Sequence, residues 1–338
     1  MWLTWAGARG PISRIAPVLL LVTAAASGCH VPGTGASGPA GGGGSIVVAD
    51  VPGIDNAPLR VGVTDGLFRQ QGLNVTIKDY QSLADVFHAL TSGQAQMAVG
   101  DYTSFFYEQA NGHASLSLIA DGYDAATNSV AILSLPGSGI ATPQQLEGQA
   151  GEVATAPAQL SPFSRAVPYN VDTLAAQEVL QNDGVSPSSV NWTPLPGQDM
   201  LSALRSGQVK AILVSEPYIL EAEEQLGATE VVDASSGVTS GLPMSGYFSL
   251  ASYAHANPSA VQAFQTALAQ AQSDCAQRGP VQSVLSRLTG MSTNDAALVT
   301  LGTYPTSMNA GQVQRVATLM YDSGMITNPI NVGALTSG

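Results

Sequence analysis

The sequence is poor in basic residues, and this scarcity narrows the partners it can have. Lysine and arginine together number 11 of 338 residues, against 24 aspartates and glutamates, so the formal net charge at pH 7 is −13. Proteins that bind nucleic acid or an anionic membrane surface concentrate positive charge where they make contact. We therefore expect no nucleic-acid partner. Because charged residues make up only 10% of the chain, we expect packing rather than ion pairs to hold the fold together.

Cysteine is rarer still. The two cysteines are Cys29 and Cys275, and only the second lies in the region that we expect to fold. This excludes an intramolecular disulfide and a cysteine-based metal cluster there. Cys275 continues an apolar helical stripe, which is typical of a buried thiol. The four histidines lack zinc-type spacing, and no nucleophile elbow, phosphate-binding glycine loop or paired-carboxylate motif stands out. We therefore expect no catalytic residue, no metal and no cofactor, and a protein that is not an enzyme.

Long hydrophobic runs are also missing, although a short one lies near the N-terminus. Arg9 and Arg14 precede the apolar residues 15–26. This stretch is too short for a membrane span, which needs about 20 residues. A basic segment, an apolar stretch and then small residues are typical of a secretory signal.

The small residues Ala26-Ser27-Gly28 lead directly to Cys29, in a pattern that resembles the bacterial lipobox, with Ala26 where leucine is usual. In a lipobox the cysteine is lipidated and becomes the new N-terminus. The alternative is an ordinary signal peptide cut nearby, with Cys29 incidental. We predict a lipoprotein signal over residues 1–29 and a Gly/Ser-rich tether over residues 30–44. The protein would then be extracytoplasmic and anchored to the membrane through lipidated Cys29.

From residue 45 onward, short apolar strands alternate with amphipathic helices. Residues 46–49, 75–77 and 97–99 have the pattern of buried strands, and a helix begins at Ser82 between the second and the third. Regular alternation of this kind predicts an α/β fold with largely parallel sheets.

One stretch of sequence recurs. Residues 89–102 and 203–216 each contain the end of a helix, a Ser-Gly-Gln turn, an apolar strand and a polar residue after the strand. The alternative is chance similarity between alanine-rich helices. We predict two similar α/β lobes, the first made of residues 45–128 and 245–338 and the second of residues 129–244.

Candidate ligand-binding residues follow the strands of both lobes. In open α/β sheets, ligands bind at the carboxyl ends of strands, where helix N-termini provide free amides. Helix capping explains any one of these positions as well as binding does, but they fall at equivalent ends of two lobes. Aromatic rings nearby would supply flat walls for a small ligand, with core packing as the alternative. The candidates chosen on these grounds are Ser82, Asp101, Tyr102, Thr103, Glu216, Tyr218 and Tyr247.

Several motifs together resemble one family of solute-binding proteins. Residues 57–68 end in Gly-Leu-Phe, and Gln71-Gly72-Leu73-Asn74-Val75 follows, while the two Ser-Gly-Gln turns match later parts of the same pattern. These motifs resemble the ABC-transporter binding proteins for nitrate, sulfonates, taurine and thiamine-pyrimidine precursors. The resemblance spans about residues 46–333. It implies a two-lobed type II periplasmic-binding-protein fold with a hinged cleft.

The resemblance also implies a function and partners. The protein would capture a small molecule, such as a sulfonate, nitrate or a pyrimidine, and deliver it to an ABC permease and its ATPase, working as a monomer. Positions where the family contacts its ligand correspond to Asn56, Gln81, Ser82, Asp101, Tyr102, Glu216 and Tyr218. Two other functions stay open: an enzyme on the same fold, of the pyrimidine- or menaquinone-pathway type, and an extracellular sensor without transport.

The charge of the ligand also stays open. The family pattern is broken between residues 156 and 170, where Arg165 lies in a proline-rich stretch. If Arg165 reaches the cleft, it favours an anionic group. Asp101 and Glu216 favour instead a ligand with an amine or a donor-rich ring.

Overall fold

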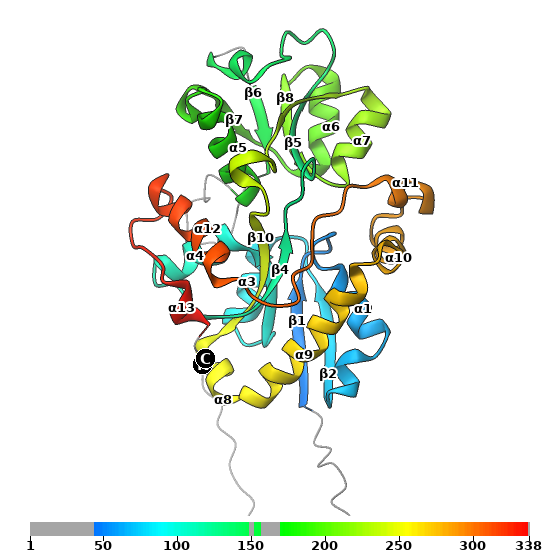
Figure 1. Cartoon of the computed structure of the whole chain (residues 1–338), viewed down its shortest axis with the longest axis vertical. Helices are drawn as coiled ribbons and strands as arrows, with labels where there is room; N and C mark the ends of the chain where they lie inside the picture. The colour runs from blue at the N-terminus through cyan, green and yellow to red at the C-terminus, as the bar shows by residue number, and fades with distance from the viewer. Residues whose placement is uncertain (1–43, 149–151, 157–169, 337–338) are drawn as a thin grey trace, which may run out of the picture. The chain divides into compact units, whose positions relative to one another are not determined.

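The strands of the protein form two five-stranded sheets, which we name sheet A and sheet B (Figure 1). The computed structural model describes residues 44–148, 152–156 and 170–336. Sheet A, in the order β2-β1-β3-β10-β4, consists of β1 (Gly44–Asp50), β2 (Leu73–Asp79), β3 (Met97–Asp101), β4 (Leu116–Asp124) and β10 (Pro243–Leu250). Sheet B, in the order β7-β6-β8-β5-β9, consists of β5 (Val130–Ser134), β6 (Glu152–Thr155), β7 (Asn191–Pro194), β8 (Ala211–Ser215) and β9 (Thr229–Asp233).

The two sheets share one topology. The central strand β3 pairs parallel with β1 and antiparallel with β10, and the central strand β8 pairs parallel with β6 and antiparallel with β5. The two copies of the sequence repeat end at these central strands. The glycine between helix and strand, Gly93 or Gly207, has a positive φ in both copies, which stops the helix. The predicted α/β fold with two similar, parallel-rich sheets is confirmed.

Helices cover both faces of each sheet. On sheet A, α1, α2 and α9 lie on one face and α3, α4 and α12 on the other, while sheet B has α6 and α7 on one face and α5 on the other (Figure 1). The helices are α1 (Ala57–Thr64), α2 (Leu67–Gln70), α3 (Leu83–Thr91), α4 (Tyr102–Ala110), α5 (Val171–Asn182), α6 (Gly197–Ser206), α7 (Tyr218–Leu226), α8 (Ala251–Ala256), α9 (Pro258–Cys275), α10 (Arg278–Thr289), α11 (Thr293–Leu298), α12 (Ala310–Asp322) and α13 (Val332–Leu335).

Because both faces of sheet A are covered, its inner strands β3 and β10 are buried along almost their whole length, whereas the edge strand β2 has exposed polar residues between its buried ones. Successive residues of a strand point to opposite faces, so Tyr247 and Phe248 of β10 enter different cores.

Cys275 lies in α9 with 3% of its surface exposed, and burial raises the pKa of its thiol to about 12. The predicted buried cysteine is confirmed. No helix in the described part of the chain is long and apolar enough to cross a membrane.

The chain passes from sheet A to sheet B after β4 and returns to sheet A in β10. The two crossing segments are hydrogen-bonded to each other: the Ala125 N–H donates to the Leu242 carbonyl at 2.9 Å, and the Ser129 N–H donates to the Ser235 hydroxyl at 3.1 Å. Adjacent crossings of this kind are typical of hinges between lobes. The lobe boundaries inferred from the sequence lie near these crossings and stay a prediction.

Candidate functional site

A cavity of about 540 Å³ lies between the two sheets and is lined from both. Sheet A contributes residues 52–55 after β1, Asp101 at the end of β3, and Ser245 of β10. Sheet B contributes the start of α5, Ser215 at the end of β8, and residues 216–218 after it. Most of these positions are at the ends of strands, where α/β folds bind their ligands. The volume lies within the range of small-molecule sites, about 300–1,000 Å³.

Three aspartates from three different helix starts line this cavity. Asp55 directly precedes the N-cap of α1, Asp101 is the N-cap of α4, and Asp172 lies in the first turn of α5. Each carboxylate is therefore near the positive end of a helix dipole, which stabilises negative charge. The Asp101 carboxylate also accepts hydrogen bonds from the Ser104 N–H, at 2.8 Å, and from the Thr103 hydroxyl, at 2.5 Å.

Burial raises the pKa of all three carboxyls, and repulsion by neighbouring aspartates adds to it for Asp55 and Asp172. The negative charge of Asp101 raises the pKa of Asp55, and the charges of both raise that of Asp172, which reaches about 7. The hydroxyls of Ser245 and Ser215 lower the pKa of Asp55 and Asp172 respectively. In the ligand-free protein, Asp172 therefore changes its charge near neutral pH, beside two further carboxyls whose pKa burial also raises.

The Ser245 hydroxyl lines the same cavity without a complete hydrogen bond. Ser245 is 2% exposed, and its oxygen has no partner within hydrogen-bonding geometry in the described part of the chain, although it faces the Asp55 carboxyl. A buried polar group without a partner costs about 1–3 kcal/mol. A ligand group that bonded this hydroxyl would remove that cost.

Glu216 also lines the cavity, but both of its carboxylate oxygens already accept hydrogen bonds from backbone N–H groups. One oxygen accepts from the Leu220 N–H at 3.2 Å, at the start of α7, and the other accepts from the Thr300 N–H at 2.8 Å. Burial raises the pKa of Glu216, and these backbone donors lower it. Thr300 belongs to residues 299–304, which join α11 to the final helices and which we name the strap.

The strap also contacts sheet A. The Gly302 N–H donates to the Tyr123 hydroxyl at 2.5 Å, and Thr303 exchanges two backbone hydrogen bonds with Asp124 of β4, at 2.9 and 3.0 Å. The Tyr304 hydroxyl donates to the Ile54 carbonyl at 2.7 Å. The strap thus links the start of α7 beside sheet B to β4 and to the loop after β1.

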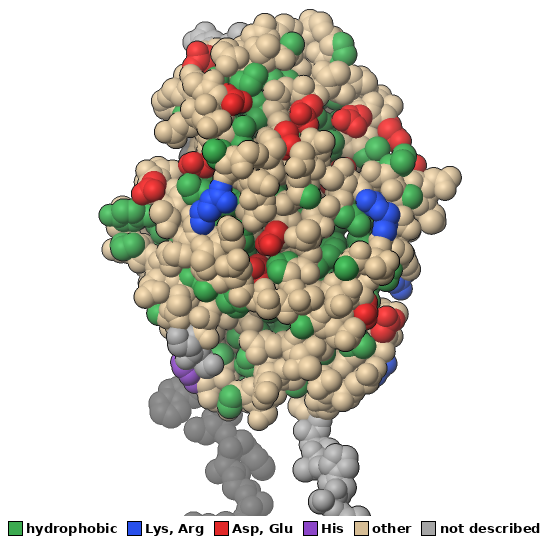
Figure 2. Space-filling model, viewed as in Figure 1, with side chains coloured by type: hydrophobic (Ala, Val, Ile, Leu, Met, Phe, Trp, Pro, Cys, Tyr) green, Lys and Arg blue, Asp and Glu red, His purple; other side chains and the backbone are tan. Residues whose placement is uncertain are grey.

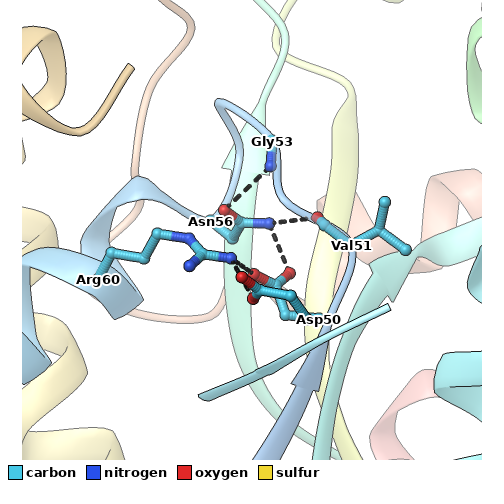
Figure 3. Close-up of polar contacts among 6 residues, drawn as sticks. Asp50, Val51, Gly53, Asn56 and Arg60 are labelled. Carbon is cyan, nitrogen blue, oxygen red and sulfur yellow. Dashed lines mark hydrogen bonds and ion pairs between the residues drawn. The ribbon is translucent and has the colours of Figure 1, made fainter. Parts of the chain in front are cut away.

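A buried polar network fixes the loop that carries Asp55 (Figure 3). The Asn56 amide donates to the Asp50 carboxylate at 2.5 Å and to the Val51 carbonyl at 2.7 Å, and its oxygen accepts from the Gly53 N–H at 3.3 Å. Arg60 pairs with Asp50 at 2.5 Å. The Asn56 side chain is 1% exposed, and its hydrogen bonds all go to this network. Asn56 therefore positions residues 51–55, and it is not one of the residues that line the cavity.

A family model described as NMT1/THI5 like matches residues 54–282, more than half of the chain. The chain belongs to the NMT1/THI5-like family. The resemblance stated from the sequence motifs is thereby confirmed. A comparison with curated protein sequences gave no match.

Solved structures similar to this NMT1/THI5-like protein have the periplasmic-binding-protein fold. The aliphatic sulphonate binding protein SsuA from Escherichia coli is 18% identical, with a TM-score of 0.68 over 87% of this chain and 97% of that one. The nitrate-binding protein NrtA from Synechocystis PCC 6803 is 14% identical, with a TM-score of 0.65 over 86% and 84%. A DSZB C27S mutant in complex with biphenyl-2-sulfinic acid is also 14% identical, with a TM-score of 0.64 over 87% and 96%. At these identities, the likeness establishes the two-lobed fold alone.

Three residues predicted from the sequence of this NMT1/THI5-like protein line the cavity: Asp101, Glu216 and Tyr218. Two others lie beside it. Ser82 is the N-cap of α3 and accepts from the Asp85 N–H at 3.2 Å, while Gln81 before it is exposed. Neither is a lining residue, although their neighbour Leu83 is.

The remaining described candidates are buried away from the cavity wall. Tyr102, Thr103 and Tyr247 are each 0% exposed, and none of them lines the cavity. The Tyr102 ring packs in the core on the α4 side of sheet A, and Tyr247 packs against α9 on the other side. Thr103 uses its hydroxyl to support Asp101, which is the residue that caps α4. These placements favour the alternative of core packing and capping for all three.

Two predicted residues, Cys29 and Arg165, lie outside the residues that the structure describes, as do the signal and nearly all of the tether. Their roles stay predictions.

Sequence reasoning missed Asp55, Asp172 and Ser245, which line the cavity. A signal was available for two of them. Asp55 precedes Asn56-Ala57-Pro58, and Asp172 follows Asn170. Both aspartates therefore lie within two residues of a helix N-cap, the kind of position for which Ser82 was chosen. Ser245 lies inside an apolar strand, and nothing local distinguishes it from a structural serine.

Proposed function

We propose that this protein is the solute-binding component of an ABC importer, held outside the cell membrane by lipidated Cys29. One observation carries the proposal: a cavity of small-molecule size is lined from two sheets of the same topology, at the ends of their strands. Two lobes joined by adjacent crossings close around a ligand by hinge motion. The lobes we propose are residues 45–128 with 245–338, and residues 129–244.

The fold neighbours support this proposal. They include sulphonate-binding and nitrate-binding periplasmic proteins, and a ligand-binding component of an ABC-type import system from Staphylococcus aureus. We propose that this protein acts as a monomer and delivers the ligand to a permease, which its ATPase drives. The small-molecule classes to test first are sulfonates, nitrate and pyrimidines.

An enzyme on the same fold has less support from the lining of the cavity. No histidine, cysteine or lysine is present among the described residues that line it, so its serines have no neighbouring imidazole or amine to act as a base. Cys275 is buried in α9, and its raised pKa makes it a poor nucleophile. We therefore propose a binding protein rather than a catalyst.

A thermal-shift screen tests the proposed function. Sulfonates, nitrate, pyrimidines, flavins and amines are added to the purified chain, and a ligand at 100 times its dissociation constant should raise the free energy of unfolding by about 2.7 kcal/mol. Ala156 lines the cavity, so Ala156→Trp should fill it and abolish the shift, while Ala276→Trp, at an exposed helix end, should not. A panel without any stabilising compound, or a shift that survives Ala156→Trp, would contradict a ligand site in this cavity.

Replacing Cys29 tests the proposed anchor. Cys29→Ala removes the thiol that the lipid would modify, so the protein should move from the membrane fraction to the soluble fraction in cell fractionation. Cys275→Ala serves as the matched control, because it removes the other cysteine of the chain and should leave the protein with the membranes. If Cys29→Ala still sediments with membranes, the anchor is not Cys29.

A further inference from the structure

The charge of the cavity lining is entirely negative in the described part of the chain. Asp55, Asp101, Asp172, Glu216 and Glu221 line it, and no lysine, arginine or histidine does so. On the face drawn in Figure 2, acidic side chains are spread over the part formed by sheet B, and few basic ones are visible. A ligand entering this cavity therefore meets carboxylates and no described counter-charge.

Two of these carboxylates already have protein partners. Asp101 accepts hydrogen bonds at the start of α4, and both oxygens of Glu216 accept backbone N–H groups. Asp55 lies beside the Ser245 hydroxyl and backbone N–H groups of residues 55 and 56, Asp172 lies beside the Ser215 hydroxyl, and neither is paired with a cation among the described residues. Buried carboxylates that repel one another and lack a cation favour a ligand that brings positive charge.

The helix N-termini that could attract an anionic ligand already have an aspartate of the chain beside them. The N-termini of α1, α4 and α5 converge on the cavity, and free helix N-termini bind anions. Here Asp55, Asp101 and Asp172 provide the negative charge at each of these three ends. The chain's own carboxylates thus take the positions that a sulfonate or nitrate oxygen would need.

A second feature points independently to a ligand. The Ser245 hydroxyl is 2% exposed, lines the cavity beside Asp55, and has no complete hydrogen bond with the described residues. A hydroxyl in this position can accept a hydrogen bond from an N–H group while the neighbouring carboxylate accepts another. Tyr123 and Tyr218 also line the cavity, and aromatic rings attract cations.

We propose that the cavity binds a small molecule with a cationic nitrogen, a protonated amine or a quaternary ammonium, between Asp55 and Asp172, with Ser245 beside it. This inference rests on the proposed solute-binding function and names the class of solute. It departs from the sulfonate and nitrate named for the fold neighbours.

Charge-matched probes test the proposal on the full chain in detergent. Choline and agmatine are the cations, 3,3-dimethylbutan-1-ol is the neutral analogue of choline, and ethanesulfonate and nitrate are the anions. We expect only the cations to raise the unfolding temperature. A shift with ethanesulfonate or nitrate instead would overturn the cationic ligand and leave the binding function standing, whereas no shift with any probe would count against both.

Substitution of the two carboxylates that would contact the cation is the second arm. Asp172→Asn and Asp55→Asn should each weaken binding of the cationic probe by about tenfold or more, because each removes one charge-assisted contact. Both should also raise the unfolding temperature of the ligand-free protein, since repulsion is relieved. Asp199→Asn is the control, at an exposed position in the first turn of α6 outside the cavity, and should change neither quantity. Unchanged affinity in both cavity variants overturns the proposal.

The pH dependence gives a third readout. Binding of a cation requires ionised aspartates, and Asp172 has a pKa of about 7 in the free protein, so affinity should rise as pH increases from 6 to 8. The other titratable groups facing this site are Asp101, Tyr123, Glu216, Tyr218 and Glu221, and burial raises the pKa of each. Affinity that falls over this interval contradicts the proposal.

Discussion

Tyr102→Ala should lower the free energy of unfolding of the ligand-free protein by about 3–5 kcal/mol, as large aromatic truncations in cores do. The Tyr102 side chain is fully buried, and its ring packs against Phe106 and Phe248 at centroid distances of 5.3 and 5.8 Å. Its hydroxyl donates to the Asp121 carboxylate at 2.7 Å. The substitution therefore leaves a void and an under-bonded buried carboxylate together.

Thermal unfolding measures this effect, and a drop on the order of 10 °C is expected for a chain of this size. Tyr102→Phe separates the two causes, because it keeps the ring and removes only the hydroxyl, for about 1–3 kcal/mol. Burial raises the pKa of Asp121 to about 6, so the cost of Tyr102→Phe should shrink at pH 5, where that carboxyl is protonated. Tyr321→Ala, at a 47% exposed tyrosine, should change stability by no more than about 0.5 kcal/mol.

A contrary result would relocate the site. If Tyr102→Ala leaves the ligand-free unfolding temperature unchanged and abolishes ligand stabilisation, the ring contacts ligand, and the arrangement of β3 and α4 described above is incorrect.

Stability should increase as pH falls from 8 to 5, the reverse of ordinary acid unfolding. Burial raises the pKa of Asp124 and Asp172 to about 7 and of Asp121 to about 6. In the unfolded chain these groups titrate near pH 4. Between these limits, the folded protein binds more protons than the unfolded chain, so the free energy of unfolding falls as pH rises. Below about pH 4 both states are protonated, and this source of pH dependence ends.

Calorimetry at constant ionic strength from pH 5 to pH 8 measures the effect. One proton of difference changes stability by about 1.4 kcal/mol per pH unit, so a single carboxyl with a pKa of about 7 accounts for a loss of about 2–3 kcal/mol, and we expect at least this loss across the interval. Asp172→Asn should flatten the curve, and Asp199→Asn should not. An unfolding temperature that is constant or highest at pH 8 would show that these carboxyls are ionised in the folded protein.

Local sequence patterns predicted the elements of the fold well, because they depend on near neighbours. Ser82 caps α3 as its sequence indicates, and the repeated Ser-Gly-Gln turn marks the entry into both central strands. The match of motifs to a family extended this local information to the arrangement of the lobes.

The site was harder to predict because similar local sequences end in different surroundings. Tyr102 and Tyr218 both begin a helix just after a central strand, yet Tyr102 is 0% exposed and Tyr218 36%. Phe248 of β10 packs on Tyr102, and that contact joins residues far apart in the sequence. The same holds for Asp55 and Asp172, whose proximity depends on how the two sheets meet. No pattern within the sequence of either segment predicts this proximity.

The strap has a consequence for the timing of the binding cycle. It is bonded to Glu216 on one side of the cavity and to Tyr123, Asp124 and Ile54 on the other. Any movement that separates these sides has to break the Thr300–Glu216 contact or move the strap along. Substitutions in the strap, none of whose residues lines the cavity, would thus change how long a solute stays trapped rather than which solute is chosen.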